Sequence, residues 1–404
     1  MTEITNSFQK KFFLYLEKSS CLTKRDHEAL WEIISALIGS SSFSLSSLST
    51  RLGRRIGRNY LARLLKKYSF IQRKVMKALL KDVLTSIGNH KKLYLIIDDT
   101  LVEKSGQKIF ASLRWYNHSS KRQTRALCLV NLVLEVDGKV LLFIPWLLTS
   151  TTKPTKKLSK KVKQQDLKNE AAITMIQSFI NVTDIQGISR QRIIIEADSW
   201  YSPYEFRSSL QKLSLDYRID GKSNYSVQKV DHDAKKKANE QTRGRKRTRF
   251  VKYEQIVKFM GDFEKWSFFT HPTSGERIFY KKAFVTLKAG GQSIIYGYKS
   301  EKYKNPKFIM VNPKRKHMPD PRTIYRDYTF RWIIEVCHRE IKQQFNIGKC
   351  QSRDMWIVNG FLMLLGFTFS VWKISVFFES QEGENIPGCP TWANDFHEEY
   401  IKRN

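Results

Sequence analysis

The sequence predicts an α/β fold in which helices precede a mixed sheet that is interrupted by a β-rich insertion. Apolar residues recur every three or four positions through residues 1–90, which is the period of amphipathic helices. From residue 92 the pattern changes to short apolar runs that end in acid, LYLIID and RIIIEAD, which are typical of buried strands. Strands and helices then alternate, as in an α/β protein.

The N-terminal region contains three helical patterns, in FFLYLEKSS, EALWEIISALIG and YLARLLKKYSFIQRKVMKALLKDVL. A short helix from Ser44, a turn near Gly53 to Gly57 and a basic second helix would form a helix-turn-helix. A plain basic helical bundle is equally compatible with the same residues. Both arrangements remain open from the sequence.

The next region contains three apolar runs between about 93 and 148, and Asp137-Gly138 marks a hairpin turn between the last two. A helix near 168–181, the strand RIIIEAD, a helix after Ser202-Pro203 and the strand LDYRID follow. The order β-β-β-α-β-α-β matches an RNase H-like core, with LDYRID as an edge strand. The runs KKAFVTLKAG, QSIIYGYK and KFIMVNPK predict a β-rich insertion.

The chain is strongly basic, with 71 Lys and Arg against 38 Asp and Glu among 404 residues, a formal net charge of +33. Because its hydrophobic content is 41%, a core can form, and disorder does not explain the charge. A folded protein this basic usually binds a polyanion, and nucleic acid is favoured over an anionic membrane. Five scattered cysteines without a CxxC pair argue against a zinc site and fit a reducing cytoplasm.

One apolar segment, residues 356–378, is long enough to span a bilayer. It contains Asn359 and Lys373 and follows a charged helix. A buried core helix is therefore favoured over a membrane span, and no membrane partner is expected.

Carboxylates follow two of the predicted buried strands. Asp98 closes LYLIID and Asp198 closes RIIIEAD, and a late helix carries Glu335. Three such acids can share one site only if divalent cations neutralise them, and Mg²⁺ prefers carboxylate oxygens. Asp99 is an alternative to Asp98, which is preferred because it ends the apolar run directly. A turn or helix cap is the ordinary alternative for each aspartate, and Asp220 is more simply a turn residue.

The stretch YTFRWIIEVCHREIK carries an unusual set of polar side chains. At ~100° per residue, Tyr328, Arg331, Glu335 and Lys342 would fall within roughly a 60° arc of one helix, with Arg339 near it. Such a face could place a metal-binding carboxylate among phosphate-binding groups. A solvated helix face explains the same pattern.

The spacing Y-x2-R-x3-E-x6-K resembles the YREK motif of bacterial insertion-sequence transposases of the DDE class. IIDDT and IEADSWYSPYEF resemble the first and second Asp motifs of that group, and the resemblance covers roughly 90–355. It implies two Mg²⁺ ions, which Mn²⁺ can replace, bound by Asp98, Asp198 and Glu335. It also implies nicking of double-stranded DNA at the element's ends and attack of the freed 3′-hydroxyl on target DNA.

The resemblance further implies that Tyr328, Arg331 and Lys342 bind phosphates near the cleaved end, with Arg339 alongside them. An insertion aromatic stacks on a flipped base in relatives, and Trp266 is the candidate here, although it also fits a core tryptophan. A dimer in the DNA complex and a bacterial cytoplasmic, nucleoid-associated location are implied as well.

The expected organisation is a helical DNA-binding domain (1–90), a catalytic core in two parts (91–220 and 321–380), a β-rich insertion (221–320) and a C-terminal tail (381–404). Two rival functions remain. One is an RNase H-like nuclease or resolvase that cleaves without strand transfer, and the other is a catalytically inactive DNA-binding protein.

Overall fold

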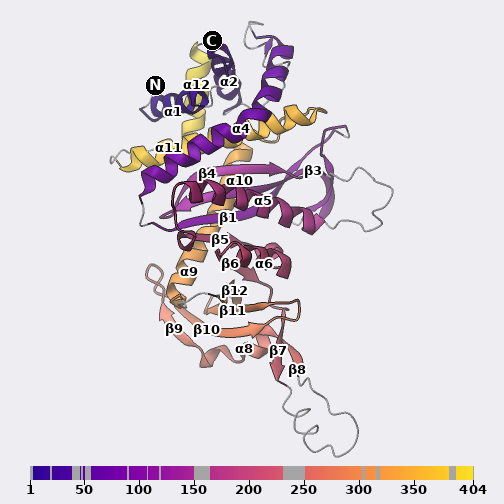
Figure 1. The fold of residues 1–404 in the computed structure, drawn as a ribbon, viewed down its shortest axis with the longest axis vertical. Helices are drawn as coiled ribbons and strands as arrows, with labels where there is room; N and C mark the ends of the chain where they lie inside the picture. The colour runs from indigo at the N-terminus through magenta and orange to yellow at the C-terminus, as the bar shows by residue number, and fades with distance from the viewer. Residues whose placement is uncertain are drawn as a thin grey trace, which may run out of the picture. The chain divides into compact units, whose positions relative to one another are not determined.

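The computed structural model describes residues 3–18, 21–38, 46, 49–50, 56–88, 91–106, 108–117, 120–149, 164–230, 251–302, 305–314, 319–381 and 388–403. The chain divides into two compact units (Figure 1). The first unit comprises Met1–Arg192 and Trp332–Asn404, and the second comprises Ile193–Arg331. The basic stretch AKKKANEQTRGRKRTR at 234–249 and most of the segment expected to begin a helix-turn-helix lie outside the described residues.

Helices of the first unit come from both ends of the chain: α1 (Glu3–Glu17), α2 (Lys24–Leu37), α4 (Arg58–Ile87), α11 (Met355–Gln381) and α12 (Cys389–Arg403). Aromatic rings of Phe8, Trp31, Trp392 and Phe396 pack together between α1, α2 and α12. The helix α2 begins with a capping box, because Thr23 and Asp26 each accept a backbone N–H at the helix start.

The apolar helix α11 is a core helix, as the sequence predicted. Its length and mean hydropathy of 1.8 suit a membrane span, but 83% of its most apolar window is buried within the protein. It runs beside α4 (Figure 1). A Cβ on Gly360 would meet the Leu65 carbonyl oxygen at 2.0 Å, and one on Gly366 would meet Pro145 at 2.4 Å. Glycine at both positions therefore permits the close packing of α11 on α4 and on the sheet.

The sheet of the first unit is antiparallel. It contains β1 (Leu93–Glu103), β2 (Leu113–Asn117), β3 (Arg122–Val136) and β4 (Lys139–Leu147), with β3 pairing to each of the other three. Asp137 and Gly138 both have positive φ, 52° and 80°, which is the hairpin turn that the sequence predicted. The helices α5 (Gln164–Ile185) and α10 (Ile333–Gln343) pack on this sheet, and a 3-10 turn spans Arg190–Arg192.

The second unit contains a mixed sheet. β5 (Ile193–Ala197) runs parallel to β6 (Asp216–Gly221), and antiparallel pairing continues through β12 (Lys307–Val311), β11 (Gln292–Ser300), β10 (Arg277–Thr286) and β9 (Ser267–Thr270). Because β12 pairs with β6, LDYRID is an internal strand, and its prediction as an edge strand was wrong. The insertion strands thus extend the sheet that begins with β5 and β6.

Helices and a hairpin complete the second unit. They are α6 (Tyr204–Lys212), α8 (Ile256–Met260), α9 (Pro321–Thr329), and the pair β7 (Ser226–Val230) and β8 (Val251–Gln255). Two 3-10 turns span Ser199–Tyr201 and Phe263–Lys265, and a third, Phe330–Trp332, includes the last two residues of the unit and the first residue of the next segment. Ile324 and Tyr328 of α9 pack into a core with Ile278, Tyr296 and Ile309.

The predicted fold class is confirmed. The chain order β1, β3, β4, α5, β5, α6, β6 follows the order predicted for an RNase H-like core, with β2 as an additional short strand.

Candidate active site

Asp98 lies in the middle of β1, not at its end, because the strand continues through Thr100 to Glu103. Its register partner on β3 is Asn131, and directly paired residues of antiparallel strands share one face of a sheet. Asp98 is half-buried, and one of its carboxylate oxygens accepts the backbone N–H of Asp99 at 2.8 Å.

Asp99 points to the opposite face, because side chains alternate along a strand. Its carboxylate forms an ion pair with Lys168 of α5 at 2.7 Å. The Cys128 thiol lies 3.8 Å from the same carboxylate, and burial together with this negative charge raises the pKa of Cys128 well above its ordinary value. Asp99 therefore joins β1 to α5, and the two neighbouring aspartates have different surroundings.

The helix that carries Glu335 covers the Asp98 face of the sheet. The buried His338, three residues after Glu335 on α10, places its Nε2 3.0 Å from the Asn131 side-chain nitrogen. That nitrogen also donates to the Leu129 carbonyl at 3.2 Å. Asn131 is the register partner of Asp98, so one hydrogen bond connects the strand pair of Asp98 to the helix of Glu335. Glu335 itself is half-buried.

The four residues of the predicted arc are divided between the two units, so the arc stays a prediction. A 3-10 turn at Phe330–Trp332 lies between α9 and α10 in the chain. Arg339 and Lys342 are exposed on α10 of the first unit, whereas Tyr328 and Arg331 belong to the second unit. Partial dehydration lowers the pKa of Lys342, and the negative charge of Glu103 opposes this effect.

Asp198 directly follows β5 in the second unit, as predicted. One carboxylate oxygen accepts the Trp200 backbone N–H at 2.9 Å and so caps the turn Ser199–Tyr201. An ionised carboxylate has roughly four acceptor positions. Capping therefore does not exclude binding of a cation by the same side chain.

Tyr328 is a buried residue rather than a surface phosphate ligand. Only 2% of it is exposed, and its hydroxyl donates to the Ala197 carbonyl at 3.1 Å. Burial raises the pKa of Tyr328 well above its ordinary value, so the hydroxyl remains a donor. Since Ala197 precedes Asp198, this bond holds the end of β5 against α9. The cations of Lys307 and Arg331 lie 4.7 Å and 5.9 Å from the centroid of the Tyr328 ring.

The parallel register pairs Ala197, the last residue of β5, with Ile219 of β6. Asp198, just past the end of β5, therefore comes next to Asp220, a neighbour that the sequence did not reveal. Burial raises the pKa of Asp220, while the positive charges of Lys307 and Arg331 oppose this shift. The turn-like sequence IDGK concealed that Asp220 is still within β6.

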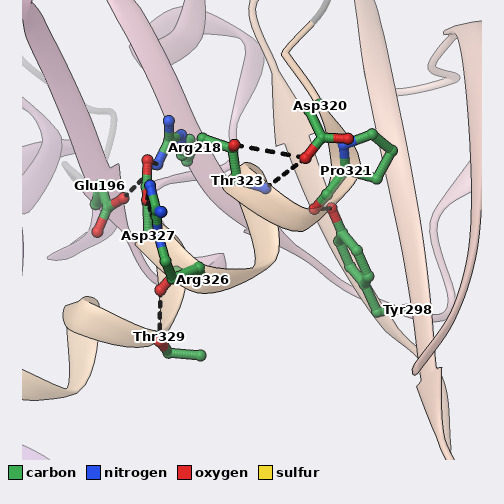
Figure 2. A network of polar contacts seen from close by, with 9 residues as sticks. All are labelled: Glu196, Arg218, Tyr298, Asp320, Pro321, Thr323, Arg326, Asp327 and Thr329. Carbon is green, nitrogen blue, oxygen red and sulfur yellow. Dashed lines mark hydrogen bonds and ion pairs between the residues drawn. The ribbon is translucent and has the colours of Figure 1, made fainter. Parts of the chain in front are cut away.

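A buried ionic network lies next to these residues (Figure 2). Arg218 of β6 contacts Asp327 of α9 at 2.9 Å and Glu196 of β5 at 3.5 Å, and all three side chains are almost fully buried. Arg326 contacts the other oxygen of Asp327 at 2.8 Å. Glu196 lies two residues before Asp198, and Asp327 adjoins Tyr328. The network therefore fixes the same junction of β5, β6 and α9 as the Tyr328 hydroxyl.

Trp266 fills the core position that the sequence also allowed. It is 7% exposed, its indole N–H donates to the Met260 carbonyl at 3.3 Å, and its ring lies so close to Gly297 that a Cβ there would approach it to 2.8 Å. These contacts account for Trp266 without a base-stacking role.

Among the described residues, no group of three His, Cys, Asp or Glu side chains gathers closely enough to hold a metal ion alone. Mg²⁺ commonly takes one or two protein carboxylates, with water and phosphate oxygens as the remaining ligands. Asp98 and Glu335 in the first unit and Asp198 in the second supply hard oxygen donors of this kind. The donor chemistry therefore fits a divalent cation such as Mg²⁺.

The order and pairing of the strands and helices are those of an RNase H-like core with helical regions. The sequence matches the family described as DDE superfamily endonuclease over residues 19–261, and the chain belongs to this family. The matched residues include Asp98 and Asp198, whereas Glu335 lies beyond them. A comparison with curated proteins finds no match.

Proposed function

We propose that the protein is the DNA transposase of a bacterial insertion sequence. The family supports cleavage of DNA with a divalent metal. The Y-x2-R-x3-E-x6-K spacing and the net charge of +33 support the narrower assignment to transposition. The observation that carries the proposal is the Asn131–His338 contact, because it places the helix of Glu335 over the sheet face of Asp98.

In this proposal Asp98, Asp198 and Glu335 are the catalytic metal ligands. Two bound Mg²⁺ ions, which Mn²⁺ can replace, would stabilise the attacking and leaving oxygens of an in-line phosphoryl displacement. Arg331 suits bidentate contact with a phosphate, and Lys342 and Arg339 supply further positive charge. Tyr328 acts as a positioning residue for Asp198, since its hydroxyl binds the Ala197 carbonyl.

The proposed substrates are the terminal inverted repeats of the element and its target DNA. The proposed catalytic residues first cut one DNA strand at the element's end. The freed 3′-hydroxyl then attacks a phosphate of the target DNA. The helical region 1–90 contributes DNA binding, and the complex with DNA contains two copies of the chain. The location is the bacterial cytoplasm, at the nucleoid.

A nuclease that does not join strands is the second candidate, because the matched family is an endonuclease and its match ends before Glu335. Incubation with a labelled element end, unlabelled target DNA and Mg²⁺ separates the candidates. A transposase yields a labelled product joined to the target, whereas nicked product alone favours the nuclease. Binding without cleavage in Mg²⁺ or Mn²⁺ favours an inactive DNA-binding protein.

A further inference from the structure

One face of α4 carries an exposed line of side chains that the catalytic residues do not use. Arg63, Lys67, Phe70, Lys74 and Lys77 are all exposed. At ~100° per residue these positions fall within roughly an 80° arc, and at 1.5 Å per residue they extend over about 21 Å. We call these five residues the α4 ridge. The opposite face of α4 is buried and packs against α11.

The ridge is cationic and only partly neutralised. Lys67 forms an ion pair with Asp26 at 2.6 Å, and the Lys74 ammonium lies 3.6 Å from the Cys21 sulfur. Arg63 and Lys77 have no carboxylate within ion-pair distance in the described part of the chain. Asp82 is the one acidic residue of α4, and it lies beyond the ridge. Uncompensated cations in such a line attract a polyanion rather than a neutral surface.

An aromatic pair lies in the middle of these cations. Phe70 is 63% exposed and Trp356, at the start of α11, is 39% exposed, with their ring centroids 4.6 Å apart. Large aromatic side chains that remain exposed in a folded chain commonly mark an interaction surface. Phe70 follows Lys67 by three residues and precedes Lys74 by four, so rings and cations lie in one line.

The aromatic pair is held in place by a neighbouring ion pair. The Asp354 carboxylate accepts the Trp356 backbone N–H at 2.9 Å and contacts Lys66 of α4 at 2.6 Å. The hydrogen bond from Lys66 and those from the backbone lower the pKa of Asp354, so it stays ionised. Because Lys66 lies one turn before Phe70, the same contact fixes Trp356 beside Phe70.

A hollow lined by both polar and apolar side chains adjoins the N-terminal end of the ridge. It has a volume of about 480 Å³ and is lined by side chains that include Arg58, Asn59, Lys349 and Ser352. Arg58 and Lys349 are exposed, so positive charge continues from the ridge into the hollow.

We propose that the α4 ridge binds a DNA strand, with its cations on phosphates of that strand and the Phe70–Trp356 pair against an unstacked base. Cations together with exposed aromatic rings are the combination by which proteins hold single strands or unpaired nucleotides. One strand advances about 3.4 Å per nucleotide, so the ridge covers roughly six nucleotides. The inference shares the DNA substrate of the proposed function but needs no catalysis.

The test is fluorescence anisotropy of the full chain with a short labelled duplex, intact or containing one unpaired thymidine, in EDTA at several salt concentrations. Each phosphate contact adds about 0.9 to the slope of log affinity against log salt. Lys74→Gln combined with Lys77→Gln should therefore lower that slope by about 1.8. Phe70→Ala should weaken binding to the unpaired probe by about five- to 150-fold, which corresponds to ~1–3 kcal/mol of stacking, and leave the slope unchanged.

Matched controls in the first unit are Lys10→Gln on α1 and Tyr116→Ala on β2, both of them exposed residues outside the ridge. These variants should bind both probes as the wild type does. A wild-type slope in the double lysine variant, or wild-type affinity of Phe70→Ala for the unpaired probe, would overturn the proposal. Glu335→Gln in the same assay should bind normally. Wild-type DNA binding by the ridge variants would contradict the ridge proposal alone. Normal cleavage by Glu335→Gln would contradict the catalytic assignment alone.

Discussion

At the scale of single residues, Asp98 and Asp99 show how one position along a strand changes the role of a carboxylate. Asp99 is paired with Lys168 of α5, whereas Asp98 shares its face with Asn131 and α10. From the sequence, Asp98 was preferred as the metal ligand because it ended an apolar run. In the structure β1 continues past Asp98, and the two residues differ because they lie on opposite faces of the sheet. Asp98 therefore has α10 as its neighbour, and Asp99 has α5.

The first prediction compares these two aspartates. Asp98→Asn should abolish Mg²⁺-dependent cleavage because it removes a proposed metal ligand. Asp99→Asn should keep cleavage within about tenfold, because it changes the contacts with Lys168 and Cys128 and no proposed metal ligand. Single-turnover cleavage of a labelled element end measures both. Inactive Asp99→Asn beside active Asp98→Asn would reverse the assignment.

The second prediction concerns His338 as a positioning residue. Loss of its contact with Asn131 in His338→Ala should slow cleavage by about ten- to 100-fold, the range found for residues that orient metal ligands. The Mg²⁺ concentration for half-maximal cleavage should rise, and DNA affinity in EDTA should not change. His338→Gln, which keeps a polar side chain near Asn131, should recover part of the rate. Unchanged Mg²⁺ dependence in His338→Ala would mean that His338 only fills the core.

At the scale of elements, the junction of β5, β6 and α9 was predicted only in part. The apolar runs predicted the strands, and the acid at the end of RIIIEAD predicted the position of Asp198. Three features of the junction depend on strand register and on a 3-10 turn. They are the burial of Tyr328, the Arg218–Asp327 contact and the position of Asp220. Neither the register nor the turn is visible in a helical period of apolar residues.

The third prediction tests the hydroxyl that holds this junction. Tyr328→Phe removes the bond to the Ala197 carbonyl and leaves a buried acceptor unpaired, so the free energy of unfolding should fall by about 1–3 kcal/mol. Cleavage should slow, because the end of β5 carries Asp198. The salt dependence of DNA binding should equal that of the wild type. A smaller salt slope would instead show that the hydroxyl contacts a phosphate, and chemical denaturation supplies the stability value.

The fourth prediction concerns pH and the contact between α2 and α4. Burial alone would raise the pKa of Asp26, but hydrogen bonds from Lys67, the Thr23 backbone and Tyr60 outweigh it and lower the pKa from 3.8 to about 2. A lowered carboxyl pKa stabilises the folded state above pH 3.8, and this stabilisation disappears as pH falls towards 2. Allowing for solvent screening, it amounts to about 1–2 kcal/mol.

The stability difference between wild type and Asp26→Asn should therefore be constant at neutral pH and shrink between about pH 4 and pH 2. Thermal unfolding at a series of pH values measures it. A difference that stays constant down to pH 2 would show that Asp26 titrates normally in the folded protein.

At the scale of the whole molecule, the function was inferred mainly from the net charge and from the order of strands and helices along the chain. The net charge of +33 indicated a polyanionic partner, and the order of strands and helices indicated the core. The match to the DDE superfamily endonuclease family over residues 19–261 confirms the predicted class of protein. The α4 ridge was not predicted, because its residues appear in the sequence as an ordinary basic amphipathic helix until burial shows which of them are exposed.

We propose that Glu335, although it lies beyond the residues matched to the family, completes the catalytic set with Asp98 and Asp198. The most direct measurement is cleavage and strand transfer by Glu335→Gln on a labelled element end in Mg²⁺, with DNA affinity measured in EDTA. We expect no nicked or joined product and wild-type affinity, because the variant loses a proposed metal ligand and no positive charge. Normal turnover by Glu335→Gln would contradict it.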